Sequence, residues 1–409
     1  MELSFRYRIY PTKEQEKKIL NTCRCARYMY NRLLKQRTTA YRNTRQWKLF
    51  DPSVIIQQCP FLAEVDPAAL LWAQNYLEMA FNNFFALKRS QSLDYRPESI
   101  FRNQCDPNYK LMIPDLMGYP RLKEKKVTRE SYTTNAKDLV VQNGRLDLPH
   151  IGSVKIRYHR DIPADAQKLC CTILKQRCGD YYAIFRLRFP DPHPRKKLLS
   201  PIGIVYRQGQ LAVRSDCYPV QYRHEDPALT ARIQKAYQTL QRRIPGSVRY
   251  EKQRQYLASL YQKRVNQRRD DLHKAALKIV KASDCICLER PEVLTRLPSL
   301  EDDDLKAELL DEAWWSFSDL IRYKAQMRGK HFWTMSPTLP IYRYCSVCEK
   351  PVPDAPDSSR WICPHCCAEL PASLNAARNM RKIAERYIRD QDRERTKQKM
   401  KYEPQDMRG

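Results

Sequence analysis

The stretch Cys345-Ser-Val-Cys348, followed after residues 349–362 by Cys363-Pro-His-Cys366, is the most informative part of this chain. Two Cys-x-x-Cys pairs at this separation are typical of a zinc ribbon, in which each pair lies on a tight turn. Four thiolates then close a tetrahedral site, and we expect a structural zinc ion there. The alternative is four cysteines without a ligand, which the regular spacing disfavours.

The other cysteines are expected to be reduced thiols. Cys367 directly follows the last ribbon cysteine and cannot easily share its turn, so we expect it to be free. The chain contains 15 Cys, an odd number without the spacing of a disulfide-rich scaffold. This usage indicates reduced thiols in a cytosolic protein.

The chain is strongly basic, with 74 Lys and Arg against 46 Asp and Glu and a formal net charge of +28. An excess this large over a folded chain implies a polyanionic partner. Its 25 Tyr interleave with the basic residues, which suits stacking on unpaired bases. We recognise no membrane-spanning run and no signal peptide, so a membrane partner is not expected. A Gly-rich phosphate loop is also lacking, which gives nucleoside-triphosphate hydrolysis no support.

The first half of the sequence predicts helices inserted into a β unit. Residues 2–10 alternate apolar and polar side chains, as a strand with one buried face does. Thr12 and Gln15 form a capping-box pattern that starts a helix, and apolar residues recur at helical spacing over 67–88. The period then changes to two, with a hairpin turn at Asn143-Gly144. We expect a small antiparallel barrel that the first strand closes.

The second half predicts an α/β sheet. Two short apolar runs, 202–205 and 211–213, indicate a strand and its hairpin partner. A long basic helical region follows over about 227–281, and it is broken near Pro245-Gly246. A strand at 286–289 then alternates with further helices and one more strand. This order is typical of an α/β fold, with the ribbon inserted just before its last helix.

Short motifs in a fixed order extend over almost the whole chain. They are Tyr7-Arg8-Ile9-Tyr10-Pro11-Thr12, Gly118-Tyr119-Pro120-Arg121, Leu148-Pro149-His150-Ile151-Gly152, Asn266 through His273, Tyr323-Lys324-Ala325, and the ribbon followed by Leu374-Asn375-Ala376-Ala377. In this order they resemble the TnpB family of transposon-encoded RNA-guided nucleases and its descendants, the miniature type V CRISPR effectors. The ribbon with its following motif is the most specific part of the resemblance.

The resemblance implies a multidomain protein with α/β, β-barrel and helical parts. In chain order, these are an OB-like wedge β-barrel (1–10 and 135–190), a helical recognition domain (11–134), an RNase H-like RuvC domain (198–340 and 371–390), a zinc-ribbon target-nucleic-acid-binding domain (341–370), and a charged tail (391–409). We expect the tail to be disordered.

In this family, three carboxylates on neighbouring elements hold two Mg²⁺ ions that cleave a phosphodiester. The corresponding positions here are Val205, Glu289 and Ser373. Valine offers no ligand atom, and serine is a weak neutral ligand that cannot replace the charge of a carboxylate. One carboxylate cannot hold a metal pair, so we expect no catalytic Mg²⁺ and no catalytic residue.

An active nuclease with a displaced metal site is one alternative. Asp216, Asp284, Glu292 or the acidic run 301–304 could supply new carboxylates. These acids are more simply explained as charges on loops and strand ends. The retained Glu289 would then be a relic, a buried acid paired with a nearby arginine.

The resemblance implies a guide RNA and a double-stranded DNA target with a short adjacent motif as partners. The residues expected to contact nucleic acid are Arg6, Arg8, Tyr10, Arg24, Arg27, Arg32, Arg121, Lys123, Lys125, Lys126, Arg268, Arg269, His273 and Lys274. Solvated basic helix faces are the alternative explanation for these residues.

The chain resembles in particular the nuclease-dead TnpB-like repressors. That resemblance implies a protein that binds a guide RNA and represses transcription by occupying matched DNA without cutting it, with the transcription machinery as a further partner. Two alternatives without cleavage are an adaptor that recruits a sigma factor or a transposition enzyme, and a basic nucleic-acid binder without a guide.

Overall fold

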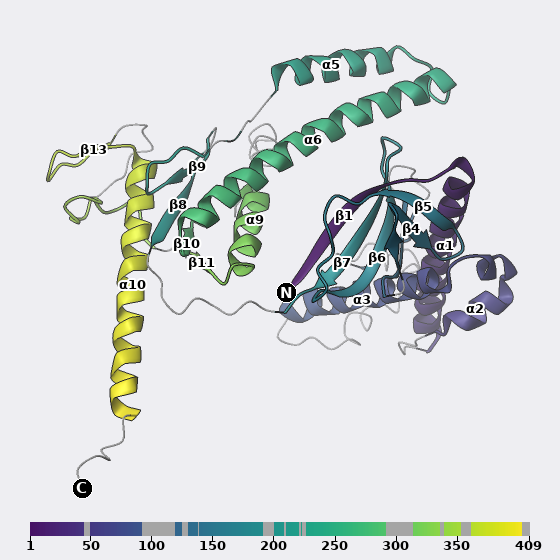
Figure 1. Cartoon of the computed structure of the whole chain (residues 1–409), viewed down its shortest axis with the longest axis horizontal. Helices are drawn as coiled ribbons and strands as arrows, with labels where there is room; N and C mark the ends of the chain where they lie inside the picture. Colours follow the sequence, from purple (N-terminus) through teal and green to yellow (C-terminus); the bar gives the residue numbers. More distant parts are fainter. Residues whose placement is uncertain are drawn as a thin grey trace, which may run out of the picture. The chain divides into compact units, whose positions relative to one another are not determined.

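The computed structural model divides the chain into two compact units, Met1–Pro190 and Asp191–Gly409 (Figure 1). The structure describes every residue except 45–49, 92–118, 125–129, 138, 191–199, 208–209, 221, 223–225, 292–313, 336–338, 353–360 and 403–409. Each unit has its own hydrophobic core. Among the described helices, none has a stretch apolar enough to cross a bilayer.

A seven-stranded antiparallel sheet forms the core of the first unit. Strand β1 (Glu2–Tyr10) lies inside it, between β5 (Gly152–Arg157) and β7 (Tyr181–Arg188). The remaining strands are β2 (Glu130–Asn135), β3 (Val141–Gln142), β4 (Arg145–Leu148) and β6 (Gln167–Lys175). The alternation in β1 buries Phe5, Tyr7 and Ile9, as the sequence predicts.

The sheet is an open half-barrel, so the expected closure by the first strand is wrong. The strand order is β2-β6-β7-β1-β5-β4-β3, which leaves β2 and β3 as the edges. Strand β2 begins at Glu130, inside the segment 11–134 that we expected to be helical. It was missed because its buried positions include Thr133 and Thr134, which give no apolar alternation.

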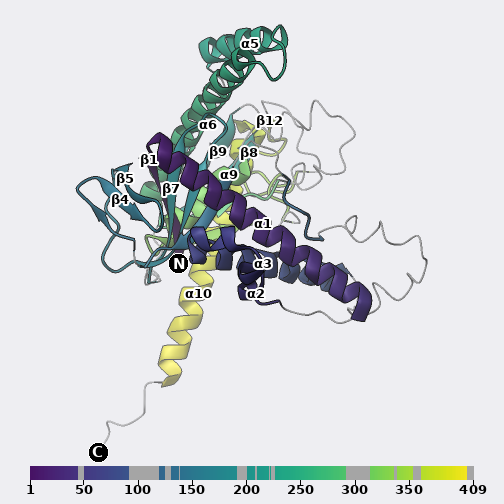
Figure 2. The same ribbon diagram turned by 90° about the vertical axis from the view of Figure 1, so that its right-hand side faces the viewer.

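Three helices pack together beside this sheet (Figure 2). They are α1 (Lys13–Thr44), α2 (Pro52–Gln58) and α3 (Pro67–Gln91), with a short 3-10 helix at Pro60–Glu64 between the last two. The capping box at the start of α1 is confirmed: Thr12 N donates to Gln15 Oε1 at 3.0 Å, and Gln15 N donates to Thr12 Oγ1 at 3.3 Å. Buried side chains of α1 and α3 share one core with the sheet.

The second unit is built on a four-stranded mixed sheet with the order β11-β10-β8-β9. Its strands are β8 (Pro201–Arg207), β9 (Leu211–Arg214), β10 (Cys285–Leu288) and β11 (His331–Thr334). Strand β10 pairs in parallel with both β8 and β11, while β9 returns antiparallel to β8 as its hairpin partner. This is the strand order expected of an α/β sheet.

Helices cover both faces of the second sheet. Helices α5 (Pro227–Gln241) and α6 (Val248–Ala282) form a long hairpin whose turn falls where the sequence predicts a break (Figure 1). The side chain of Ser247 caps α6 by accepting from Tyr250 N at 3.1 Å. Buried residues of α6 and of α9 (Trp314–Gln326) share a core with alternate residues of β8 and β10.

The opposite face of the sheet packs against α10 (Ala372–Tyr402). A Cβ on Gly203 of β8 would lie 2.1 Å from the carbonyl oxygen of Ala377, so the helix backbone rests directly on the strand. The helix runs well into the segment that we expected to be disordered. It does so because residues 372–402 contain neither Gly nor Pro, and the first Pro follows at 404.

Candidate functional site

Val205 is the first of the three positions at which the sequence comparison expects a carboxylate. Its neighbour in β8, Ile204, packs on the α6 side of the sheet, whereas Val205 faces α10. Val205 is fully buried in an apolar cluster that includes Cys287, Ala376 and Ala377. Its side chain is therefore part of the contact between sheet and helix.

Glu289 directly follows β10, whose four residues are all buried. The Glu289 carboxylate accepts hydrogen bonds from Tyr206 N and from the Tyr342 hydroxyl, both at 2.8 Å. Burial raises the pKa of Glu289, and these two hydrogen bonds offset only part of that rise. The alternative in which Glu289 pairs with a nearby arginine is not seen among the described residues, where a backbone amide and a neutral hydroxyl bind the carboxylate.

Ser373 lies in the first turn of α10, and its hydroxyl is 3.4 Å from Arg207 Nη1 at the end of β8. The three positions therefore lie near the carboxyl ends of the two central strands, β8 and β10. Val205 packs against the start of α10, the next residue binds Glu289, and Arg207 reaches Ser373. The fold brings the predicted residues together, and they offer a single carboxyl group.

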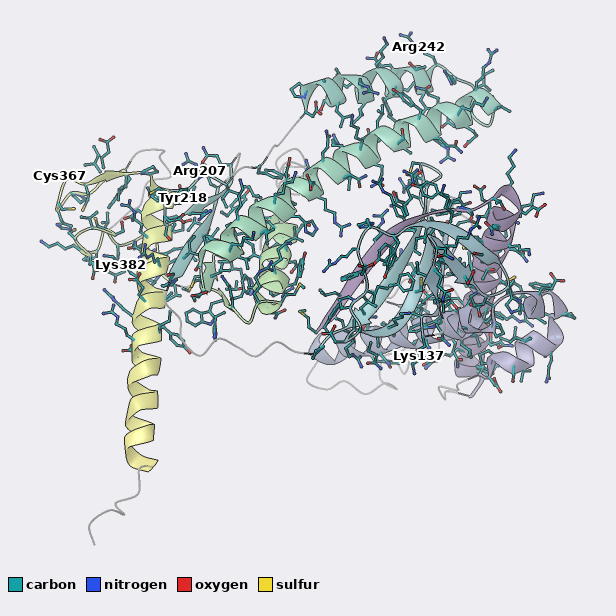
Figure 3. All side chains as sticks on the ribbon, in the orientation of Figure 1. Lys137, Arg207, Tyr218, Arg242, Cys367 and Lys382 are labelled. Carbon is teal, nitrogen blue, oxygen red and sulfur yellow. The ribbon has the colours of Figure 1, made fainter. Side chains whose placement is uncertain are left out.

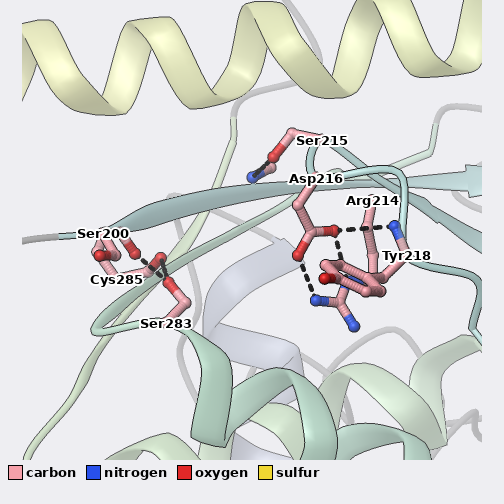
Figure 4. Close-up of polar contacts among 8 residues, drawn as sticks. Ser200, Arg214, Ser215, Asp216, Tyr218, Ser283 and Cys285 are labelled. Carbon is pink, nitrogen blue, oxygen red and sulfur yellow. Dashed lines mark hydrogen bonds and ion pairs between the residues drawn. The ribbon is translucent and has the colours of Figure 1, made fainter.

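The acids that could rebuild a metal site have other partners. Asp216 accepts both guanidinium hydrogen bonds of Arg214 and a further one from Tyr218 N at 3.3 Å (Figure 4). Asp284 lies 3.4 Å from Lys330 Nζ. Glu292 and residues 301–304 lie outside the described part of the chain.

The four ribbon cysteines form the one group of three or more metal-type side chains that is compact enough to hold an ion, within the residues that the structure describes. All four sulfur atoms lie within 4.8 Å of one another. The amides of Val347 and His365 donate to Cys345 Sγ and Cys363 Sγ at 3.4 Å, as expected of metal-binding turns. Four soft thiolates suit Zn²⁺, so the donor set fits a structural zinc ion.

Two residues beside this cluster do not take part in it. Cys367 is exposed in a left-handed backbone conformation (φ 56°), and its amide donates to Cys363 O. His365 directs Nε2 at Pro351 O, 3.2 Å away. Neither residue belongs to the compact sulfur group, in agreement with the sequence.

The ribbon is held onto α10 by two asparagines, Asn375 of the motif that follows the ribbon and Asn379, whose structural role the sequence did not reveal. Asn375 Oδ1 accepts from Ser346 N at 2.7 Å, and Asn379 Nδ2 donates to Ile341 O at 2.8 Å. Outside them, Glu349 of the ribbon forms ion pairs with Lys382 and Arg386. Asn375 and Asn379 are four residues apart, on one face of a basic helix, and this spacing is the sequence signal that could have revealed the contact.

In the first unit, the predicted nucleic-acid residues of β1 have protein partners of their own. The Arg6 guanidinium lies 3.7 Å from the ring centre of Tyr182, and Arg8 is paired with Asp180. Tyr10 is 42% exposed at the end of the strand. Tyr10 is the aromatic member of these three residues, and it is accessible to solvent.

Two predicted residues of the helical part meet at a cavity of about 500 Å³. Arg27 and Lys123 both line it, beside Tyr76 and Glu130. Asn31 holds the backbone of Lys123 through two hydrogen bonds of 2.8 and 2.9 Å. Arg24, Arg32 and Arg121 are exposed, as are Arg8, Tyr10 and Lys123, whereas Lys125 and Lys126 lie outside the described residues.

In the second unit, the predicted residues lie in sequence on α6. Arg269 is exposed and Arg268 is half-buried, while Lys274 pairs with Asp270 at 2.5 Å. His273 packs against Tyr323, and burial together with nearby cations lowers the pKa of His273. A neutral ring at this position favours a packing role over a phosphate contact.

Three family models match separate parts of this chain. Residues 1–46 match a "Helix-turn-helix domain" of IS605 OrfB proteins, which here folds as β1 followed by one long helix. Residues 227–292 match the IS605 OrfB "Probable transposase", and residues 314–380 match the "Cas12f1-like, TNB domain". The chain is therefore similar to IS605 OrfB and Cas12f1-like proteins over three separate segments.

The similarity to known proteins extends over most of this chain. The chain is 26% identical over 386 residues to a "Putative RNA-guided DNA endonuclease" of Streptomyces pristinaespiralis, covering 92% of this chain and 88% of that protein. It is 23% identical over 288 residues to the "Putative RNA-guided DNA endonuclease InsQ" of Escherichia coli K12, covering 66% and 70%.

The fold is similar to that of a chain in the solved "Cas12f1-sgRNA-target DNA complex". The TM-score is 0.52 at 11% sequence identity, and the match covers 93% of this chain and 98% of that chain. At this identity the likeness shows a common architecture. The TnpB-like chain thus has a Cas12f1-like fold with a half-barrel sheet and a four-cysteine cluster.

Proposed function

We propose that this TnpB-like chain is an RNA-guided DNA-binding protein that has lost metal-dependent cleavage and acts by occupying its target. Its guide RNA would read the DNA by base pairing, while the basic surface holds the backbones. Two observations support guided DNA binding: the names of the full-length relatives and the net charge of +28. In this proposal the half-barrel sheet serves as the wedge domain, and the second unit is a RuvC-like domain.

The observation that carries the loss of cleavage is the burial of Val205 beneath α10. A magnesium pair needs several oxygen ligands in near-octahedral geometry. At the three relevant positions, Val205 is packed in an apolar cluster, and Ser373 Oγ is within hydrogen-bonding distance of Arg207. Glu289 already accepts two hydrogen bonds, and burial favours its protonated form. This set of residues does not fit a magnesium pair.

Arg207 adds an electrostatic argument against a metal pair. Its guanidinium lies beside Ser373, at the carboxyl end of β8, where a carboxylate would otherwise attract cations. A fixed positive charge there repels Mg²⁺ instead of gathering it. The apolar packing, the enclosed acid and the added cation all oppose the same reaction.

A guided protein that stays on uncut DNA blocks whatever else must use that DNA. Occlusion of a promoter by such a complex would repress transcription without any enzymatic step. The proposal therefore makes repression the outcome of binding alone.

The test is to purify the protein with its RNA from the native host and to sequence that RNA. The loaded protein is then incubated with a plasmid carrying the matched sequence in Mg²⁺. We expect a guide-dependent footprint on a plasmid that stays supercoiled. Nicking by the wild type that disappears in Glu289→Ala would overturn the loss of cleavage. Random cellular RNA in the preparation would remove the guided part of the proposal.

A further inference from the structure

The residues that lead into the zinc ribbon are bound to the end of the second sheet. The parallel pairing of β8 and β10 ends at Leu288, where Glu289 N donates to Ile204 O at 3.0 Å. Beyond that point the Glu289 carboxylate accepts from Tyr206 N, in the place of a further strand carbonyl. The Tyr342 hydroxyl donates to the other carboxylate oxygen at 2.8 Å. Glu289 thus joins both central strands to a residue that lies three positions before the first ribbon cysteine.

The chain just before Cys345 is also bound by α10. Asn379 Nδ2 donates to Ile341 O at 2.8 Å and to Tyr344 O at 2.7 Å. The side chain of Ile341 is buried with Val205 in the cluster between the sheet and the helix. This short segment therefore belongs to the ribbon at one end and to the core of the second unit at the other.

Among the described residues of the ribbon, the buried cluster is small. It consists of Cys345, Val352, Trp361 and Cys363, and two of these four belong to the cysteine group that can hold a metal ion. A module with so small a core depends on its metal for folding, as small zinc modules do. Bonds from the four sulfur atoms to one ion fix the turn at Cys345, and without them the apolar contacts are too few to hold it.

We propose that the ribbon is a zinc-dependent clamp on the carboxyl end of the second sheet. Loss of zinc frees the turn at Cys345. The backbone partners of Asn379 then move, and the Tyr342 hydroxyl leaves Glu289. The start of α10 and the ends of β8 and β10 loosen, while the face of the sheet that packs on α6 and α9 keeps its contacts. The proposal concerns the fold of the second unit and does not rest on the proposed loss of cleavage.

Hydrogen exchange of the full-length chain, measured with zinc bound and after its removal by a chelator, tests this coupling. The amide of Tyr206 is the direct reporter, because it donates to the Glu289 carboxylate. We expect zinc removal to speed exchange about tenfold at Tyr206 and at residues 374–380, where hydrogen bonds are lost. If the chelator does not remove the metal, Cys366→Ser, at an exposed member of the cysteine group, supplies the zinc-poor state.

Two controls separate this coupling from general unfolding. The hairpin of α5 and α6, whose far end carries Arg242 (Figure 3), has its own buried cluster and should exchange at the same rate with and without zinc. Tyr342→Phe removes only a hydroxyl, so exchange at Tyr206 should already be fast with zinc bound and should change little on its removal. Tyr237→Phe removes a hydroxyl from an exposed position of α5 and should respond as the wild type does.

Three results would overturn the proposal. The first is exchange at Tyr206 that stays slow after verified zinc loss, which would make the ribbon independent of the sheet. The second is an equal rise at Tyr206 and in the buried part of α6, residues 272–280, which would show that zinc only keeps the whole unit folded. The third is a response of Tyr342→Phe equal to that of the wild type. None of these measurements involves DNA, so their failure is independent of the plasmid assay that tests for cleavage.

Discussion

The side-chain amide of Asn375 in α10 donates a hydrogen bond of 2.7 Å to the carbonyl oxygen of Tyr344, the residue before the first ribbon cysteine. The other atom of the same amide, Oδ1, accepts from Ser346 N just after that cysteine. One helical side chain thus satisfies the backbone on both sides of Cys345. The helix that follows the ribbon in sequence determines how its first metal-binding turn is held.

Asn375→Ala should loosen this turn. It leaves the buried Ser346 amide without its acceptor, at a cost of about 2 kcal/mol. We expect faster loss of zinc to a chromogenic chelator and faster hydrogen exchange at residues 344–348. Asn82→Ala, on an exposed position of α3, is the control and should change neither rate. Unchanged zinc loss in Asn375→Ala would show that the hydrogen bonds do not hold the turn.

Zinc content should depend on the four clustered cysteines and not on their neighbour. We expect one zinc per wild-type chain, retained in Cys367→Ser and strongly reduced in Cys345→Ser, because three thiolates bind zinc more weakly than four. Metal analysis by mass spectrometry after extensive dialysis checks this. Equal zinc loss in both variants would argue against the four-sulfur site.

Gly203→Ala should disturb the contact between β8 and α10. The new Cβ would lie 2.1 Å from a backbone oxygen of the helix, so one element must move. We expect increased hydrogen exchange in both elements and a lower melting temperature. Gly246→Ala is the comparison, since its Cβ would meet open space and only its left-handed backbone costs about 1 kcal/mol. Similar destabilisation by the two variants would contradict the close packing.

Val205→Asp should destabilise the second unit without restoring cleavage. The substitution places a carboxylate in an apolar cluster without a partner, which costs about 3 kcal/mol. Val205→Thr, which keeps the shape of the side chain, should cost less. Chemical denaturation followed by far-ultraviolet circular dichroism compares the two. Mg²⁺-dependent nicking by Val205→Asp alone would show that the metal site is closer to intact than we propose.

The stability of the wild type relative to Glu289→Gln should fall as pH rises above 4.5, the ordinary pKa of glutamate. Because burial raises the pKa of Glu289, the folded state binds the proton more tightly than the unfolded state above that pH. Glutamine keeps an acceptor and avoids the buried charge. Glu349 should show the opposite trend, because Lys382 and Arg386 lower its pKa. Melting temperatures from pH 5 to 8 test the sign for Glu289, and those below pH 4.5, where Glu349 begins to take up a proton, test the sign for Glu349.

Local sequence signals predicted much of this fold. Alternation in β1, the capping box at Thr12 and Gln15, and the break before α6 all act within a few residues, and the structure has each of them. Strand β2 was missed because its buried threonines are satisfied by distant groups. Thr134 donates to Asp66, and Thr133 bonds Thr172 of the neighbouring strand. A polar residue that finds its partner only in the fold leaves no apolar pattern in the sequence.

The sequence predicted which residues make up the candidate site, but it did not predict the hydrogen bonds between them. The spacing of the cysteines indicated the four-sulfur cluster directly, and the resemblance to a known family indicated Val205, Glu289 and Ser373. The contact between Arg207 and Ser373 joins residues 166 positions apart, and the one between Tyr206 and Glu289 spans 83. Such pairs form only after the sheet and α10 have assembled, so no local pattern could reveal them.

The packing of Val205 has an evolutionary consequence. Because Val205 is part of the contact between β8 and α10, its replacement by aspartate weakens the fold immediately. A second acid at Ser373 and the removal of Arg207 would also be needed before a bound metal could offset that loss of stability. The core thus opposes the stepwise assembly of a metal site at this position, because the first acid lowers stability before the set of ligands is complete.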